Sequence, residues 1–147
     1  MMNTMLLDRF LAGQDPEAEC WMRAGWRKFY ESGSDDALDL LRFLGLPTSR
    51  RATLVSIRDH KLRAAMHYLD PDGTRTVYSR AKLLRQACQA FARRWPVWQR
   101  QYGTWPDSAN YLERALFDAF DAAVAAGHLT PDELSLSSLR QIVGNAA

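Results

Sequence analysis

Apolar residues recur at helical spacing along most of the chain, and this pattern predicts a mainly α protein. The clearest helix start is Asp15, an N-cap residue followed by Pro16 at the first helical position and by acidic residues in the first turn. This helix is expected to run to about Ser32, where Gly33 ends it. A shorter helix is expected before it, at residues 4–12.

The same signals predict helices further along the chain. A third helix is expected to begin at its cap Ser34 and to end near Leu44, and its apolar residues point in almost every direction, so we expect it to be deeply buried. Ser79 is expected to cap the next confident helix. The remaining helices are predicted at about residues 79–95, 107–126 and 137–143.

Residues 48–79 are the ambiguous part of the pattern. Residues 61–78 favour a β-hairpin, because the turn at 70–73 supplies Pro and Gly and the branched and aromatic residues after it favour extended backbone. The alternative is one long helix from Ser49 to Leu69, whose apolar residues also fit the helical period. The hairpin is the preferred interpretation. It predicts a small, mainly α helical bundle with one β-hairpin, at the border of the α+β class.

The expected order of elements over residues 37–79 resembles that of winged helix-turn-helix DNA-binding domains. It comprises a buried helix, a turn that contains glycine and proline, a second helix and a hairpin. The resemblance implies that the second helix enters the major groove with Arg50 and Arg51 near its N-terminus. The wing, which carries Arg63 and Arg75, would lie along the phosphate backbone. One departure is Arg51, which stands where this motif expects an apolar residue.

Length and composition indicate one globular domain. The chain has 147 residues, of which 47% are hydrophobic, and no repeat or linker divides it. We expect a helical N-terminal part (1–47), a basic central part (48–100) and a helical C-terminal part (101–147). With two cysteines, no long apolar run and no basic leader, the sequence predicts a cytoplasmic protein that does not enter the membrane.

The net charge of +2 conceals a strong asymmetry along the chain. Residues 1–49 carry five Lys and Arg against eight Asp and Glu, and residues 101–147 carry two against six. Residues 50–100 carry twelve against three. A concentration of positive charge of this kind indicates either an acidic partner or acidic ends that pack on the basic middle.

The basic middle supplies the candidate binding residues. Phosphate binding requires several cations on one surface, and exposed tyrosine or tryptophan rings among them can stack on bases. Such rings are present at Tyr68, Tyr78, Trp95 and Trp98, although tryptophans in a small domain are more often part of the core. The predicted contacts to nucleic acid or to an acidic partner are Arg50, Arg51, Arg58, Lys61, Arg63, Arg75, Lys82, Arg85 and Arg93.

No motif in the sequence predicts a metal site, a cofactor site or a catalytic site. The three histidines do not stand at metal-ligand spacing with a second His or Cys. No serine lies in a nucleophile elbow, and no glycine-rich loop is placed to hold phosphate. The sequence therefore predicts a protein that is not an enzyme.

Two hypotheses about function follow. The first is a small protein that binds nucleic acid, DNA in particular, in a regulatory or accessory role. The second is a compact helical interaction module, in the manner of an inhibitor encoded by a phage or another mobile element, that occupies a protein or a complex bearing nucleic acid. A homodimer is compatible with either hypothesis.

Overall fold

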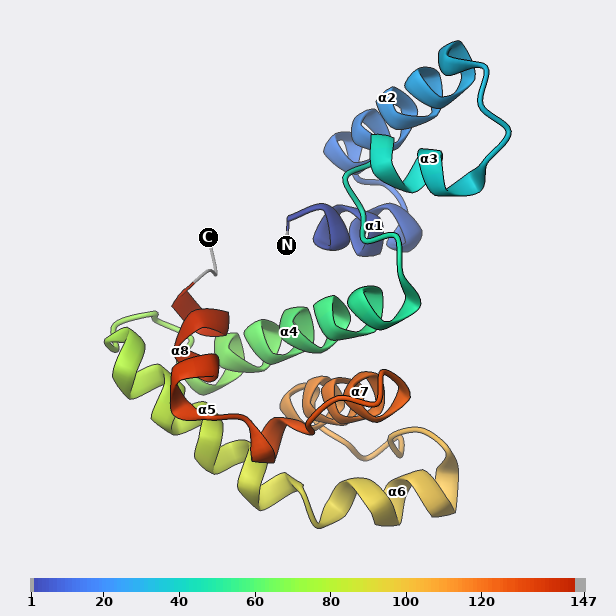
Figure 1. Ribbon diagram of the computed structural model, residues 1–147. Coiled ribbons are helices and arrows are strands. Elements are labelled where there is room, and N and C mark those ends of the chain that lie inside the picture. The colour runs from blue at the N-terminus through green and yellow to red at the C-terminus, as the bar shows by residue number, and fades with distance from the viewer. Residues whose placement is uncertain (1, 145–147) are drawn as a thin grey trace. The chain divides into compact units, whose positions relative to one another are not determined.

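The computed structural model describes residues 2–144 of the chain (Figure 1). These residues form eight α-helices and one short 3-10 helix, with no strand among them. They divide into two compact units, residues 1–56 and 57–147, and one helix runs from the first unit into the second. The predicted single domain stays a prediction, because compact units can belong to one cooperative domain. Within the described part of the chain, no helix has both the length and the apolar content needed to cross a bilayer.

The first unit is organised around Leu44. The carbonyl of Leu44 accepts hydrogen bonds from Asn3 Nδ2 at 2.8 Å and from Trp21 Nε1 at 3.1 Å. A Cβ atom on Gly25 would lie 2.1 Å from Leu44 Cδ2, so glycine permits the close approach of the two segments. The helices of this unit are α1 (Met2–Ala12), α2 (Pro16–Ser32), α3 (Ala37–Phe43) and the first residues of α4 (Arg50–Leu69).

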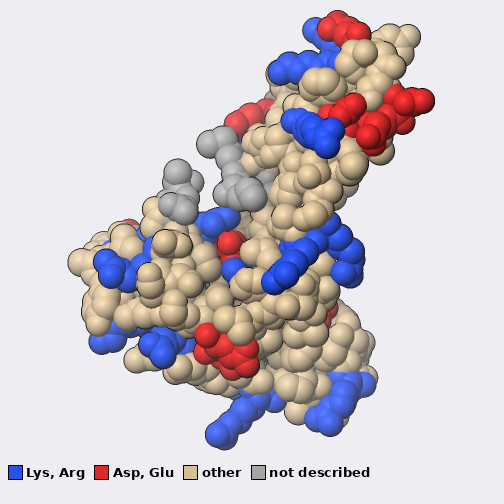
Figure 2. All heavy atoms as spheres, in the orientation of Figure 1, with Lys and Arg blue, Asp and Glu red and all other residues tan. Residues whose placement is uncertain are grey.

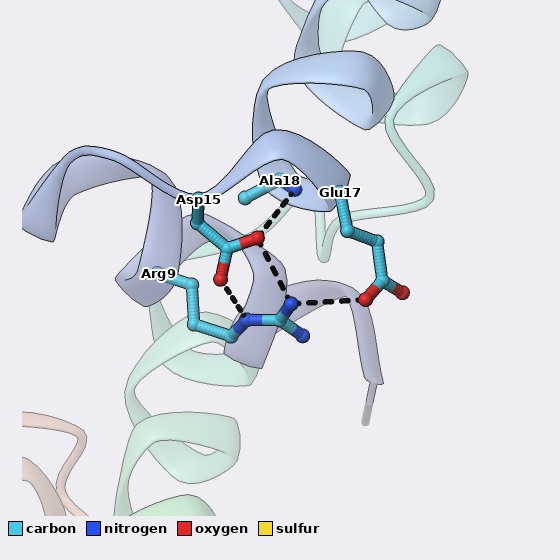
Figure 3. A network of polar contacts seen from close by, with 4 residues as sticks. All are labelled: Arg9, Asp15, Glu17 and Ala18. Atoms are coloured by element: carbon cyan, nitrogen blue, oxygen red, sulfur yellow. Dashed lines mark hydrogen bonds and ion pairs between the residues drawn. The ribbon is translucent and has the colours of Figure 1, made fainter.

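The predicted start of α2 is confirmed. Asp15 is its N-cap, with the carboxylate accepting a hydrogen bond from the backbone N–H of Ala18, and Pro16 is the first helical residue. Arg9 of α1 donates to Asp15 at 2.6 Å and to Glu17 at 2.9 Å, as Figure 3 shows. The hydrogen bonds from Arg9, and then that from Ala18, lower the pKa of Asp15.

The expectation for α3 is wrong in two respects. Its N-cap is Asp36, whose side chain accepts from the N–H of Leu38, whereas the Ser34 hydroxyl donates to Asp39 and accepts from the N–H of Asp36. None of its residues is buried, and Leu38 and Phe43 are 41% and 38% exposed. A helix of seven residues that packs on one neighbour buries only one stripe, so its other apolar side chains remain in solvent.

The second unit is built around α7. Seven residues of this helix are buried, and Figure 1 shows α4, α5 and α6 around it. Its Phe117 and Phe120 pack against Phe91 and Trp98 in edge-on or tilted contacts. The elements of this unit after α4 are α5 (Val77–Phe91), α6 (Arg94–Tyr102), α7 (Tyr111–Ala125), η1 (Pro131–Glu133) and α8 (Leu136–Gly144).

The predicted β-hairpin is wrong, and the long-helix alternative is correct for residues 50–69. Leu62 and Met66 lie one turn apart, and both are completely buried, so the core selects the helical period in this segment. Thr76 does have extended backbone, with φ −64° and ψ 160°, but it serves as the N-cap of α5 and accepts from the N–H of Ser79. Ser79 is therefore not the cap. The winged helix-turn-helix fold, which requires the hairpin, is excluded for these residues.

The turn between α4 and α5 is held by a buried carboxylate. The side chain of Asp70 is 5% exposed, accepts from the backbone N–H of Arg75 at 3.3 Å and lies 3.8 Å from Nε of Arg80. Arg80 Nε is buried and has no hydrogen-bond partner, so Asp70 supplies its charge balance at ion-pair distance. One acidic side chain thus connects the end of α4 with the first turns of α5.

We expect Asp70→Asn to lower the free energy of unfolding by about 2 kcal/mol, because the variant leaves the buried Nε of Arg80 without a compensating charge. Chemical denaturation in urea measures the change. Asp72→Asn is the matched control: Asp72 lies exposed in the same turn, so its loss should change stability by less than about 0.5 kcal/mol. Equal effects of the two substitutions would contradict the role given to Asp70.

The two cysteines are expected to differ in reactivity. Cys20 is exposed, whereas Cys88 is buried in the core, where burial, with a smaller contribution from Asp132, raises the pKa of its thiol to about 12. In the native protein, a thiol reagent such as DTNB should react with Cys20 alone, and with both cysteines only after denaturation. A Cys20→Ser variant should give almost no native reaction. Rapid labelling of Cys88 in that variant would show that the core is open.

Candidate nucleic-acid interface

The nine candidate binding residues lie on four parts of the structure. Arg75 precedes α5, and Arg93 lies between α5 and α6. Helix α4 carries Arg50, Arg51, Arg58, Lys61 and Arg63, and helix α5 carries Lys82 and Arg85. Their surroundings differ so much that the nine do not form one binding surface.

Arg58 is enclosed within the second unit. It is 5% exposed, its Nη2 lies 2.7 Å from Asp59 Oδ1, and its Nη1 lies 2.7 Å from His128 Nδ1. A guanidinium can only donate, so Nδ1 of His128 is the acceptor in this contact. These partners leave Arg58 inaccessible to a phosphate group.

Two further cations of α4 are also buried or partly buried within the unit. Arg63 is 8% exposed, and its Nη2 atom is buried without a hydrogen bond. Lys61 is partly buried, with its Nζ 3.7 Å from Asp118 Oδ2 of α7. A surface for an acidic partner therefore omits Arg58, Lys61 and Arg63.

Arg50 and Arg51 are exposed in the first turn of α4. They belong to the first compact unit, whereas Arg75, Lys82, Arg85 and Arg93 belong to the second. The helix that was expected to enter the major groove is present, but the wing beside it is not. The other exposed cations among the nine candidates lie in α5 and directly before and after it.

Helix α5 has two distinct faces. Ala81, Leu84, Cys88 and Phe91 are buried and form the apolar stripe. Tyr78, Lys82, Arg85 and Gln89 follow one another at spacings of four, three and four residues, so they form a second stripe, and all four are exposed. Burial of the first stripe fixes the direction in which the second one points.

The segment around α5 and α6 contains no acidic residue. Residues 73–106 include seven Lys and Arg and neither Asp nor Glu. Two of the seven are paired with carboxylates from elsewhere: Arg80 with Asp70, and Arg94 with Glu113. The other five are exposed and make no ion pair within residues 2–144; we call them the basic edge: Arg75, Lys82, Arg85, Arg93 and Arg100.

Figure 2 shows basic side chains spaced along α5 and α6, with an acidic group beside α5 where η1 lies. The positive charge therefore follows the two helices as a row and does not fill one round patch. A row of separated cations suits an extended polyanion better than a single compact anion, because successive charges can meet successive phosphates.

A small hollow lies at the start of the basic edge. Its volume is about 260 Å³, and Arg75 Nη1 donates to Ser79 Oγ at 3.2 Å in its wall. Lys82 Nζ lies 5.4 Å and Arg140 Cζ 5.9 Å from the centre of the Tyr78 ring. The hollow is lined by Arg75, Tyr78, Ser79, Lys82, Leu83 and Gln86.

Sequence reasoning missed Arg140. It lies on α8, in the acidic last third of the chain, and comes close to the Tyr78 ring because α8 packs along α5. No local signal marks it. Of the four aromatic residues considered for stacking, Trp95 and Trp98 pack against the core, and Tyr68 stacks on Tyr111, which leaves Tyr78 beside the cations.

Among the described residues, no group of three or more His, Cys, Asp or Glu is placed to hold a metal ion. Comparison with known proteins found no matching family model, no matching curated protein and no matching solved structure. The chemistry of the basic edge is therefore the basis on which a function can be argued.

We expect Asp118→Asn to make the protein more stable at neutral pH. Burial raises the pKa of Asp118, although Lys61 and Trp105 favour its ionised form, so ionising it in the folded protein costs stability. The cost is complete above the raised pKa and disappears below the ordinary pKa of about 4, where the carboxyl is protonated in both states. Urea denaturation of both proteins at neutral pH and near pH 4 should show a difference that shrinks as the pH falls.

Asp107→Asn serves as the control for this measurement, since Asp107 is exposed. Its effect on stability should be small at both pH values. An Asp118→Asn protein that is less stable than the original at neutral pH would show that the contacts of the carboxylate outweigh its burial.

Proposed function

We propose that this protein binds nucleic acid through the basic edge, with DNA as the first partner to test, in a regulatory or accessory role. The observation that supports the proposal most directly is the acid-free segment 73–106, whose five remaining cations are exposed and unpaired within residues 2–144. Each cation that meets a phosphate releases condensed counterions, and this release supplies affinity without base recognition. The two free cysteines fit a reducing, cytoplasmic compartment, which is part of the proposal.

The basic edge predicts a specific dependence on salt. If three to five of its cations meet phosphates of a duplex, the slope of log affinity against log salt is about −2.7 to −4.5. Affinity should then fall about 40- to 500-fold between about 50 and 200 mM salt. Fluorescence anisotropy with a labelled DNA duplex of about 20 base pairs measures this slope. A salt-independent interaction, or none with duplex DNA, single-stranded DNA and RNA alike, would overturn the proposal.

A pair of charge reversals locates the surface. Lys82→Glu with Arg85→Glu should weaken binding at least about tenfold, because two phosphate contacts become repulsive. The matched control is Arg23→Glu with Arg27→Glu, which changes the net charge equally at two exposed positions on α2. The control should retain most of the affinity. Equal losses in the two proteins would mean that net charge, and not the basic edge, governs binding.

A second candidate function is a helical module that occupies another protein. It is favoured by the exposed apolar side chains of the first unit: Leu11 is 73%, Trp26 51% and Tyr30 87% exposed. Large aromatic side chains are frequent energetic anchors of protein interfaces. The anisotropy experiment distinguishes the two functions. An interaction module that contacts its partner through the first unit does not need the basic edge, so it should bind none of the oligonucleotides.

A further inference from the structure

An aromatic ring lies near the start of the basic edge, close to cations from two helices. Tyr78 lies in the first turn of α5 and is 50% exposed. Lys82, one turn further along α5, and Arg140 of α8 both lie within 6 Å of the ring centre, at 5.4 and 5.9 Å. Two cations therefore lie close to the ring, and the residue still keeps half of its surface in solvent.

The hollow beside Tyr78 is small. Its volume of about 260 Å³ is below the range of about 300–1,000 Å³ that encloses a whole small-molecule ligand. It can receive one base or one phosphate of a longer chain. Its wall offers the cations Arg75 and Lys82, the hydroxyl of Ser79 and the amide of Gln86 beside the ring, which is a mixture of phosphate-binding, base-binding and stacking groups.

We propose that this hollow selects single-stranded nucleic acid: an unpaired base stacks on Tyr78 while Arg75, Lys82 and Arg140 hold the adjoining phosphates. This inference rests on the proposed function and gives it a substrate class. Within a duplex both faces of a base are covered by its neighbours, so an exposed ring gains nothing from paired bases. A single strand can place a base on the ring and its phosphates on the cations. The basic edge then guides the rest of the strand along α5 and α6.

The position of the ring supports this assignment over a purely intrahelical role. A contact between Tyr78 and Lys82 alone would be an ordinary pair one turn apart on a helix surface. Arg140, however, comes from a different helix, where α8 packs along α5. The fold therefore brings the ring and the two cations together before a ligand binds, which lowers the entropy lost on binding.

The test compares a labelled single-stranded DNA of about 20 nucleotides with the duplex of the same sequence, at one salt concentration, by fluorescence anisotropy. The unmodified protein should bind the single strand more tightly. Tyr78→Ala should weaken single-strand binding about 5- to 150-fold, the range expected for loss of one stacked base, and should leave duplex binding unchanged. Tyr78→Phe, which keeps the ring, should bind nearly as well as the unmodified protein.

Tyr30→Ala is the matched control, since it removes an exposed tyrosine from α2, in the first unit. It should not change single-strand binding. Thermal unfolding of each variant reports whether the fold is kept, and Tyr78→Phe retains the ring if Tyr78→Ala proves unstable. Tyr78→Phe removes only the hydroxyl. Weaker single-strand binding by this variant would overturn the stacking role.

The outcomes separate this inference from the proposed function. Binding of both oligonucleotides with equal affinity, or a Tyr78→Ala effect that is absent or equal for the two, overturns the single-strand inference and leaves the basic edge supported. Absence of binding to either oligonucleotide overturns the proposed function itself. Single-stranded RNA, used as a third probe, shows whether the protein prefers the unpaired bases of DNA or those of RNA.

Discussion

The second unit depends on one buried carboxylate. Asp70 directly follows α4, accepts the N–H of Arg75 and balances the charge of Arg80, so it ties the end of α4 to the first turns of α5. The apolar stripe of α5 then packs against α7 and α8, and the stripe that contains Tyr78 and Lys82 is left facing solvent. The surface residues in the first turns of α5 are therefore positioned in part by a carboxylate that is itself buried. A buried charge without its partner is costly, so few other conformations of the turn are available.

The structure divides the basic middle of the chain into two groups with different roles. On α4, Arg58 and Lys61 meet Asp59, His128 and Asp118, so these cations connect elements of the second unit. On α5 and α6, most cations face solvent, and within residues 2–144 only Arg80 and Arg94 lie at ion-pair distance from a carboxylate. The sequence shows the total charge of the segment but not this division, because burial of Arg58 depends on contacts with residues about 70 positions away.

Local signals were sufficient where a helix is specified by its own ends. Asp15, Pro16 and Gly33 predicted α2 correctly, since caps act within one turn. The hairpin failed because Thr76 and its neighbours favour extended backbone, and a single extended residue is also what an N-cap requires. The helix expected at about residues 79–95 ends at Phe91, and Pro96 lies in the first turn of the next helix, α6, where proline is tolerated. Of the candidate site, Lys82 and Arg85 could be found from the charge pattern, but Arg140 required the packing of α8 on α5.

The composition of the basic edge is itself an argument for a ligand. Like charges one turn apart on a helix destabilise it by a few tenths of a kcal/mol for each pair, so Lys82 and Arg85 are unfavourable together in the isolated protein. The fold does place carboxylates against Arg80 and Arg94 nearby, so compensation is structurally available in this region. Residues 73–106 nevertheless contain no Asp or Glu. The proposed binding of a polyanion would neutralise this charge row and offset its cost in stability.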